Sequence, residues 1–338
     1  MPPPLRAGAD TVQRRDFLGL SVGALALAVA PRALAAPSFD RFRLTEWGRT
    51  RRFVRTTFGS IAFLDEGQGA EVLFLHGFPL NGFQWRHAVE QLSLFNRCIV
   101  PDFLGLGFTE VAEGQDVGPD AQVGMLVALL DALNVARVHV IANDSGGTVA
   151  QLLVARHPDR VRTLLLTNCD TEIESPPAAM APVIALSKQG EYANQWLAPW
   201  LENKDRARAP DGLGGMCFAD PANPTDEALE TYLGPLLMSA RRRQLAEAYA
   251  IALEKNALAG IGPALRRSPV PVRIVWGMAD TIFSPRGADH LDSSFGVSLG
   301  VRRLPQSKLF WPEERPDVIV AEARALWNTP AGRMRSAA

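Results

Sequence analysis

The residues from Ile141 to Gly147 read IANDSGG and place two possible nucleophiles side by side, Asp144 and Ser145. A strand-like run, RVHVI, ends inside this stretch, and a helix-like run, GGTVAQLLVARH, follows it. A tight turn between a strand and a helix holds its central residue in a strained conformation and needs small neighbours. Because such a turn presents its central side chain for attack, the sequence predicts a nucleophile at one of these two positions.

The pattern of small residues favours Asp144. In the frame small-x-nucleophile-x-small-small, the small positions fall on Ala142 and on the Gly146–Gly147 pair when Asp144 is central. A frame centred on Ser145 puts Asn143 where a small residue is required. We therefore interpret Asp144 as the nucleophile and Ser145 as the residue that follows it.

A carboxylate at this turn changes the chemistry, because at its ordinary pKa it is ionised at neutral pH and needs no base to attack. Attack on an sp3 carbon leaves an alkyl ester on Asp144. A water molecule, activated by a histidine that a second acid orients, then hydrolyses the ester at its carbonyl. The backbone N–H groups of Ser145 and of Phe78, in the HGFP turn, are placed to stabilise the resulting oxyanion.

Alternating strands and helices must position these residues. Apolar runs that end in polar or turn residues predict strands at 61–67, 71–77, 96–102, 137–144, 160–168 and 270–280, with helical patterns between them at 83–94, 121–133 and 147–157. This alternation predicts an α/β fold with a mostly parallel sheet flanked by helices. Ligand chemistry in such a sheet collects at the carboxyl ends of the strands, which here carry His76, Asp102, Asp144, Asp170 and Asp280.

One long segment breaks the alternation. No strand is legible over residues 172–258, which read as helical and follow the sixth strand. We expect this segment to form a helical lid (cap) over the strand ends, and residues 37–171 and 259–338 to form the core. The substrate pocket between them is expected to include seven residues: His76, Trp85, Asn143, Trp196, Trp200, Tyr232 and Leu309.

The composition excludes several classes of partner. The chain has 338 residues, 47% of them hydrophobic, and a formal net charge of −1, so nothing in its charge favours a nucleic acid or an anionic membrane. Its three cysteines lack the spacing of a zinc site and indicate core residues rather than a disulfide framework: Cys98, Cys169 and Cys217. GLGF lacks the spacing of a dinucleotide fingerprint. We expect a small-molecule substrate, no metal and no cofactor.

Residues 1–36 are predicted to be an export signal. A twin arginine (Arg14, Arg15), an apolar run over residues 17–30 and small residues up to Ala36 follow one another in the order of a cleavable signal. The apolar run is shorter than the roughly 20 residues that span a bilayer, so no stable membrane anchor is expected. QRRDFL resembles the bacterial twin-arginine signal, which implies folded export through the twin-arginine translocase, to the periplasm or beyond.

Four segments resemble the α/β-hydrolase superfamily: LHGFPLNGFQWR, PDFLGLGFTE, IANDSGGTVAQ and VWGMADTIFSP. The resemblance implies the α/β-hydrolase fold, with Asp144 as nucleophile and Asp280 as the acid. The aspartate at the turn and the HGFP segment resemble the branch of epoxide hydrolases and haloalkane dehalogenases, which implies hydrolysis of an epoxide, a haloalkane or an ester. That branch usually has Trp where this chain has Ser145. Epoxide hydrolases use two lid tyrosines as ring-opening acids, and Tyr232 is the best candidate here, with packing in the core as its alternative role.

The general-base histidine of this fold has no counterpart in the sequence. The family segment LPGAGHFxxEERP aligns without a gap with LPQSKLFWPEERP, from Leu304 to Pro316, and puts Leu309 at the histidine position. His290 is a substitute base only if its helix reaches the turn. Glu313 and Glu314 are expected to be solvated carboxylates at the start of the last helix.

Without that histidine, an ester on Asp144 would form and persist, because water is a poor nucleophile unless a base takes its proton. Three interpretations follow. Another residue or a substrate group serves as the base of a specialised hydrolase, or Asp144 acts as a general acid or base in lyase or isomerase chemistry, sharing a proton with Asp280. In the third, the pocket binds a small apolar ligand without turnover.

Overall fold

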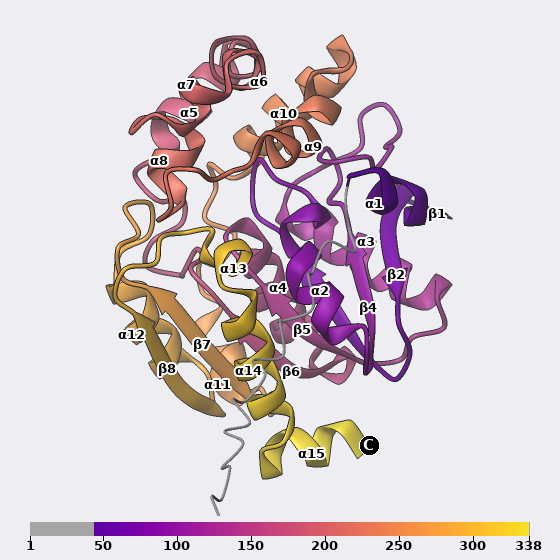
Figure 1. Ribbon diagram of the computed structural model, residues 1–338. Coiled ribbons are helices and arrows are strands. Elements are labelled where there is room, and N and C mark those ends of the chain that lie inside the picture. The colour runs from indigo at the N-terminus through magenta and orange to yellow at the C-terminus, as the bar shows by residue number, and fades with distance from the viewer. Residues whose placement is uncertain (1–43, 338) are drawn as a thin grey trace, which may run out of the picture. The chain divides into compact units, whose positions relative to one another are not determined.

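The computed structural model describes residues 44–337, in which helices flank a single sheet (Figure 1). The predicted export signal, residues 1–36, lies outside the described residues. Within residues 44–337, no helix is long and apolar enough to cross a membrane. The same part of the chain contains no group of three or more His, Cys, Asp or Glu side chains that could hold a metal ion.

The sheet has eight strands in the order β1-β2-β4-β3-β5-β6-β7-β8. β1 and β2 are antiparallel to their neighbours, and the pairs from β4 to β8 are parallel. The bounds are β1 Arg52–Thr56, β2 Gly59–Glu66, β3 Ala70–Leu75, β4 Asn96–Pro101, β5 Val138–Ala142, β6 Val161–Leu166, β7 Val272–Gly277 and β8 Ser298–Leu304. All six predicted strands are present, and β5 is buried along its whole length, as expected for a strand covered on both faces.

Helices cover both faces of the sheet. α2 packs against α14, α4 packs against both α3 and α11, and α12 packs on β7 and β8. The helices around the sheet and the short segments near them are α1 Leu44–Thr50, η1 Gly82–Trp85, α2 Arg86–Leu92, α3 Pro119–Ala132, α4 Ser145–Arg156, η2 Pro158–Arg160, α11 Gly262–Arg267, α12 Arg286–Ser294, α13 Trp311–Glu314, α14 Pro316–Trp327 and α15 Pro330–Ala337. The α/β fold with a mostly parallel sheet flanked by helices, predicted from the alternating pattern, is confirmed.

Between β6 and β7 the chain forms a series of helices that we call the helical insertion. It consists of α5 Met180–Lys188, the π-helical η3 Ala193–Leu197, α6 Ala198–Glu202, α7 Lys204–Arg208, α8 Leu213–Cys217, α9 Asp226–Leu237 and α10 Ala240–Ala252. These helices gather at the top of Figure 1, on one side of the sheet. No described residue between β6 and β7 belongs to a strand, as the sequence predicts. The domain bounds, with a lid at 172–258, stay a prediction.

Candidate active site

Asp144 lies at the turn between β5 and α4. Its backbone angles, φ 54° and ψ −133°, are outside the regions that ordinary residues prefer, and a strained turn of this kind costs on the order of 1–3 kcal/mol. The neighbouring Gly146 has no room for a side chain, because a Cβ atom there would lie 2.5 Å from the carbonyl oxygen of Leu75. The turn therefore has the geometry that the small-residue pattern predicts, with Asp144 at its tip.

Backbone donors hold the Asp144 carboxyl. The N–H of Phe78 donates to Oδ2 at 2.7 Å, and the N–H of Ser145 also donates to the carboxyl. These are the two groups that the sequence analysis proposes for an oxyanion hole. In the structure they bind the carboxyl of Asp144 itself, and they hold it in place at the cavity described below.

The HGFP turn is held from behind by His76. Its Nε2 accepts a hydrogen bond from the N–H of Phe103 at 3.0 Å, so the proton lies on Nδ1, which donates to the carbonyl of Gly77 at 2.9 Å. Burial lowers the pKa of His76, which keeps the ring neutral. His76 is fully buried and does not line the cavity, so its role is to position the turn that carries Phe78.

Burial raises the pKa of Asp144 to about 8. The nearby Asp170 raises it further, the hydrogen bonds from Phe78 and Ser145 oppose the shift, and Asp280 adds to it. At pH 7 this carboxyl is therefore mostly protonated. The expectation that Asp144 is already ionised at neutral pH is wrong, because it rests on the pKa of an exposed carboxyl and the site is enclosed.

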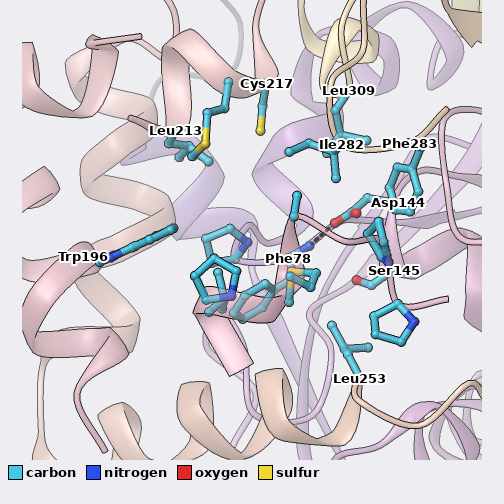
Figure 2. A pocket seen from close by; sticks show the side chains of 18 of the residues that line it. Phe78, Asp144, Ser145, Trp196, Leu213, Cys217, Leu253, Ile282, Phe283 and Leu309 are labelled. Carbon is cyan, nitrogen blue, oxygen red and sulfur yellow. Dashed lines mark hydrogen bonds between the residues drawn. The ribbon is translucent and has the colours of Figure 1, made fainter. Parts of the chain in front are cut away.

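A cavity of about 280 Å³ lies in front of Asp144. Figure 2 shows Asp144 and Ser145 on one side of it and Trp196, from the helical insertion, across from them. Its walls are predominantly apolar, and the residues that line it include Phe78, Met180, Val183, Tyr192, Trp196, Trp200, Leu213, Met216, Cys217, Leu253, Ile282, Phe283 and Leu309. Such a lining suits a small, largely apolar organic molecule.

Leu309 lines the cavity beside Ile282, as Figure 2 shows. Its backbone oxygen accepts a hydrogen bond from Asn143 Nδ2 at 3.1 Å, which ties this loop to the end of β5. All five histidines lie among residues 44–337, and none of them lines the cavity. His290, the candidate for a substitute base, lies on α12 and does not reach the cavity wall. The position at which the base is expected is therefore occupied by an apolar side chain.

Four residues predicted to line the pocket do not line it: His76, Trp85, Asn143 and Tyr232. Trp85 and Asn143 are fully buried behind the site. Asn143 uses its amide to bind Gln84, Thr167 and the backbone of the Leu309 loop, which explains its polar type at a buried position.

Tyr232 belongs to a different cluster. Its hydroxyl donates to Oε2 of Glu313 at 2.7 Å and accepts from Arg86, whose guanidinium forms an ion pair with Glu313 at 2.6 Å. All three side chains are buried. The cluster joins α9 of the helical insertion to α2 and α13 of the core. Two predictions are therefore wrong: Tyr232 is not a ring-opening acid, and Glu313 is not a solvated carboxylate.

The other two tyrosines of the chain, Tyr192 and Tyr249, lie close to Asp144 and Ser145. Tyr192 lines the cavity. The ring of Tyr249, from α10, stacks on Phe78 with centroids 5.4 Å apart, and its hydroxyl lies 3.1 Å from Ser145 Oγ. Burial raises the pKa of both tyrosines, so both stay protonated at neutral pH. Sequence reasoning missed them, because nothing in their local patterns distinguishes them from Tyr232.

Asp280 follows β7 and does not line the cavity. Its Oδ1 accepts from the N–H of Ile282 and its Oδ2 from Asn168 Nδ2, each at 2.8 Å. Burial raises its pKa to about 6. Among the described hydrogen bonds there is none between Asp280 and Asp144, so nothing shows the shared proton considered for this pair. Asp280 has the fixed orientation of an acid that would position a histidine, although no histidine is there.

Comparisons with known proteins agree with this fold. The family model for the alpha/beta hydrolase fold matches residues 71–308. Haloalkane dehalogenase 2 of Mycobacterium tuberculosis is 25% identical over 292 residues, which cover 80% of this chain and 92% of that protein.

Solved structures show the same fold. An esterase from Thermogutta terrifontis aligns with a TM-score of 0.65 and 22% identity, covering 81% of this chain and 97% of the esterase. The epoxide hydrolase CorEH aligns with a TM-score of 0.68 and 19% identity, covering 82% of this chain and 98% of that structure. The hydrolases among these relatives support the prediction of an enzyme. With a family match over more than half of its length, this chain belongs to the alpha/beta hydrolase fold family.

Proposed function

We propose that this protein is an exported enzyme that acts on a small, largely apolar organic electrophile, with Asp144 as the nucleophile. The observation that carries the proposal is the position of Asp144: it lies at a strained turn facing an apolar cavity, and Phe78 N–H binds its Oδ2 at 2.7 Å. A carboxyl oriented in this way is suited to attack an sp3 carbon.

The first step forms an ester. A carboxylate oxygen of Asp144 bonds to the substrate carbon, and the carbon's bond to its leaving group breaks. The N–H groups of Phe78 and Ser145 already bind the carboxyl, and they then stabilise the oxyanion that forms when water attacks the ester. The same two donors serve both steps.

An epoxide suits the site better than a haloalkane. Opening an epoxide creates an alkoxide that must be protonated, and Tyr192 in the cavity wall and Tyr249 beside Ser145 are two buried phenols that remain protonated at neutral pH. Ser145 stands where dehalogenases usually have a tryptophan. The similarity to an epoxide hydrolase structure supports the fold of this proposal and not its chemistry.

A second candidate function is favoured by the pKa of Asp144, which burial raises to about 8. A carboxyl that is mostly protonated at pH 7 can act as a general acid in lyase or isomerase chemistry. The apolar cavity fits this reaction equally well, and no covalent ester would form.

Mass spectrometry of the intact protein separates the two functions. After exposure to a terminal alkyl epoxide or a 1-bromoalkane, a nucleophilic Asp144 is expected to give a mass increase located on the peptide that contains Asp144. Asp144→Asn is the matched control and is expected to give no adduct. Absence of any adduct on the unchanged protein at pH 8 and pH 9 would contradict the nucleophile and leave the acid–base function.

We also propose that residues 1–36 direct the folded protein through the twin-arginine translocase. The order of the twin arginine, apolar run and small residues supports this. Replacing Arg14 and Arg15 together by lysine is expected to keep the protein in the cytoplasm of a bacterial host, as measured by cell fractionation. Unchanged export of this variant would contradict the twin-arginine route.

A further inference from the structure

We propose that Asp170 is the general base that hydrolyses the ester on Asp144, in place of the histidine that Leu309 replaces. This inference rests on the proposed function, because it needs the ester to form. Asp170 follows β6, at the carboxyl end of the strand next to β5. The order of strands in the sequence already predicts its place at the active edge of the sheet.

The backbone brings Asp170 against the nucleophile turn. The N–H of Asp144 donates to the carbonyl of Asn168 at 2.7 Å, two residues before Asp170. On the helix side, a Cβ atom at Gly147 would lie 2.3 Å from Cys169 Cβ, so residues 168–170 run directly beside the turn. The two carboxyls are close enough that Asp170 raises the pKa of Asp144 more than Asp280 does.

Asp170 has the access that a base needs. Asp144 and Asp170 are the two carboxyl side chains among the described residues that line the cavity. Asp280 stands outside the lining. A water molecule in the cavity therefore meets Asp170 and not Asp280.

The surroundings hold Asp170 in place and leave it ionised. Gln151 Nε2 donates to its backbone oxygen at 2.8 Å, and the hydroxyl of Ser175 donates to its carboxyl. Burial raises the pKa of Asp170 to about 6, and the charge of Glu174, in the same loop, also raises it. The other titratable groups beside it are the carboxyl of Asp144, the phenol of Tyr249 and the thiol of Cys169. The ester of Asp144 carries no charge at any pH, so it does not oppose the ionisation of Asp170 in the step that needs it.

The proposed step balances as follows. Asp170 takes a proton from water, and the water oxygen bonds to Cγ of the Asp144 ester. The oxyanion is held by the N–H groups of Phe78 and Ser145. The bond from Cγ to the alkoxy oxygen then breaks, Asp170 returns the proton to that oxygen, and the alcohol leaves. Asp144 is regenerated as a carboxylic acid, its main form below pH 8.

The test replaces Asp170 by Asn, which has nearly the same size. We expect Asp170→Asn to form the adduct with a terminal alkyl epoxide at least as fast as the unchanged protein, since Asp144 loses a neighbouring negative charge. We expect the adduct to disappear at least about 100-fold more slowly, the usual loss when a general base is removed. Time-resolved mass spectrometry of the intact protein measures both rates, and thermal unfolding checks that the variant folds.

A second measurement needs no variant. In the unchanged protein, loss of the adduct is expected to speed up with rising pH and to level off above about pH 6, where Asp170 is ionised. Single turnover in ¹⁸O-labelled water is expected to place the label in Asp144, because water attacks Cγ.

The outcomes separate the two proposals. If the adduct forms and clears at the same rate with Asn at 170, Asp170 is not the base, and the nucleophile stands. If Asp280→Asn stalls the ester and Asp170→Asn does not, the base is Asp280, and the inference is overturned. If neither the unchanged protein nor the Asp170→Asn variant forms an adduct at any pH, the proposed function fails and the inference falls with it.

Discussion

The backbone N–H of Phe78 donates to Oδ2 of Asp144 at 2.7 Å, although 66 residues separate them in the chain. The bond joins the turn after β3 to the turn after β5, which are neighbouring strands of the sheet. One donor thereby holds the proposed nucleophile and, in the proposed reaction, is placed to stabilise the oxyanion. Because the donor is a backbone group, substitution of the Phe78 side chain by another non-proline residue leaves it in place.

The rate of ester formation should rise with pH. The ionised carboxyl attacks, and burial raises the pKa of Asp144 to about 8, so the reactive fraction increases roughly 50-fold between pH 6 and pH 8. Bromide release from a 1-bromoalkane in the first turnover measures this rate. A rate that is constant over this range would show that Asp144 is ionised throughout or is not the nucleophile.

Asp144→Asn is expected to stabilise the fold, and more so as pH rises from 5 to 8. In the unfolded chain the carboxyl ionises at its ordinary pKa of about 4, whereas in the folded protein it stays protonated up to about 8. Stability is therefore lost as pH rises through this window, by up to about 1.4 kcal/mol per pH unit, and the amide removes the loss. Thermal unfolding of both proteins at several pH values measures the difference. An equal gain at pH 5 and pH 8 would contradict the shifted pKa.

Leu309→His is expected to speed up loss of the ester by at least about tenfold, because it supplies a second base in the cavity wall. Leu309→Gln is the matched control, being polar and of similar length without a basic nitrogen. The adduct lifetime on each variant is the measurement. An unchanged lifetime with histidine, in a protein that unfolds at the normal temperature, would show that the geometry at 309 no longer supports a base.

Tyr232→Phe and Tyr249→Phe should affect different properties, the first the stability of the fold and the second the rate of epoxide opening. Loss of the Tyr232 hydroxyl leaves buried Glu313 and Arg86 with one partner fewer, at about 1–3 kcal/mol of stability, with little effect on the rate of epoxide opening. Loss of the Tyr249 hydroxyl removes a proton donor beside Ser145 and should slow epoxide opening more than bromide displacement. Denaturant unfolding and the two rates make the comparison. A slower epoxide reaction in Tyr232→Phe alone would reverse these assignments.

Much of the fold could be predicted because burial on both faces leaves a direct trace in the sequence. β3 (AEVLFL) and β5 (VHVIA) are mostly apolar, and both were predicted. β1 was not predicted, because it lies at the edge of the sheet, is mostly exposed, and carries Arg52 and Arg55 in place of an apolar run. The pocket residues were predicted less well. Trp196 and Trp200 line the cavity as expected, but Trp85 does not.

The sequence by itself determined the nucleophile turn and the lack of a base at 309. Small residues around Asp144 are a local steric requirement, and the alignment of LPQSKLFWPEERP is a matter of residue order. The tertiary structure alone decided three other features: the pKa of Asp144, the tyrosines at the site, and the place of Asp170 beside the nucleophile. Each of these depends on which distant segments enclose a side chain. Desolvation and neighbouring charge arise from that enclosure, and no local pattern of residues records it.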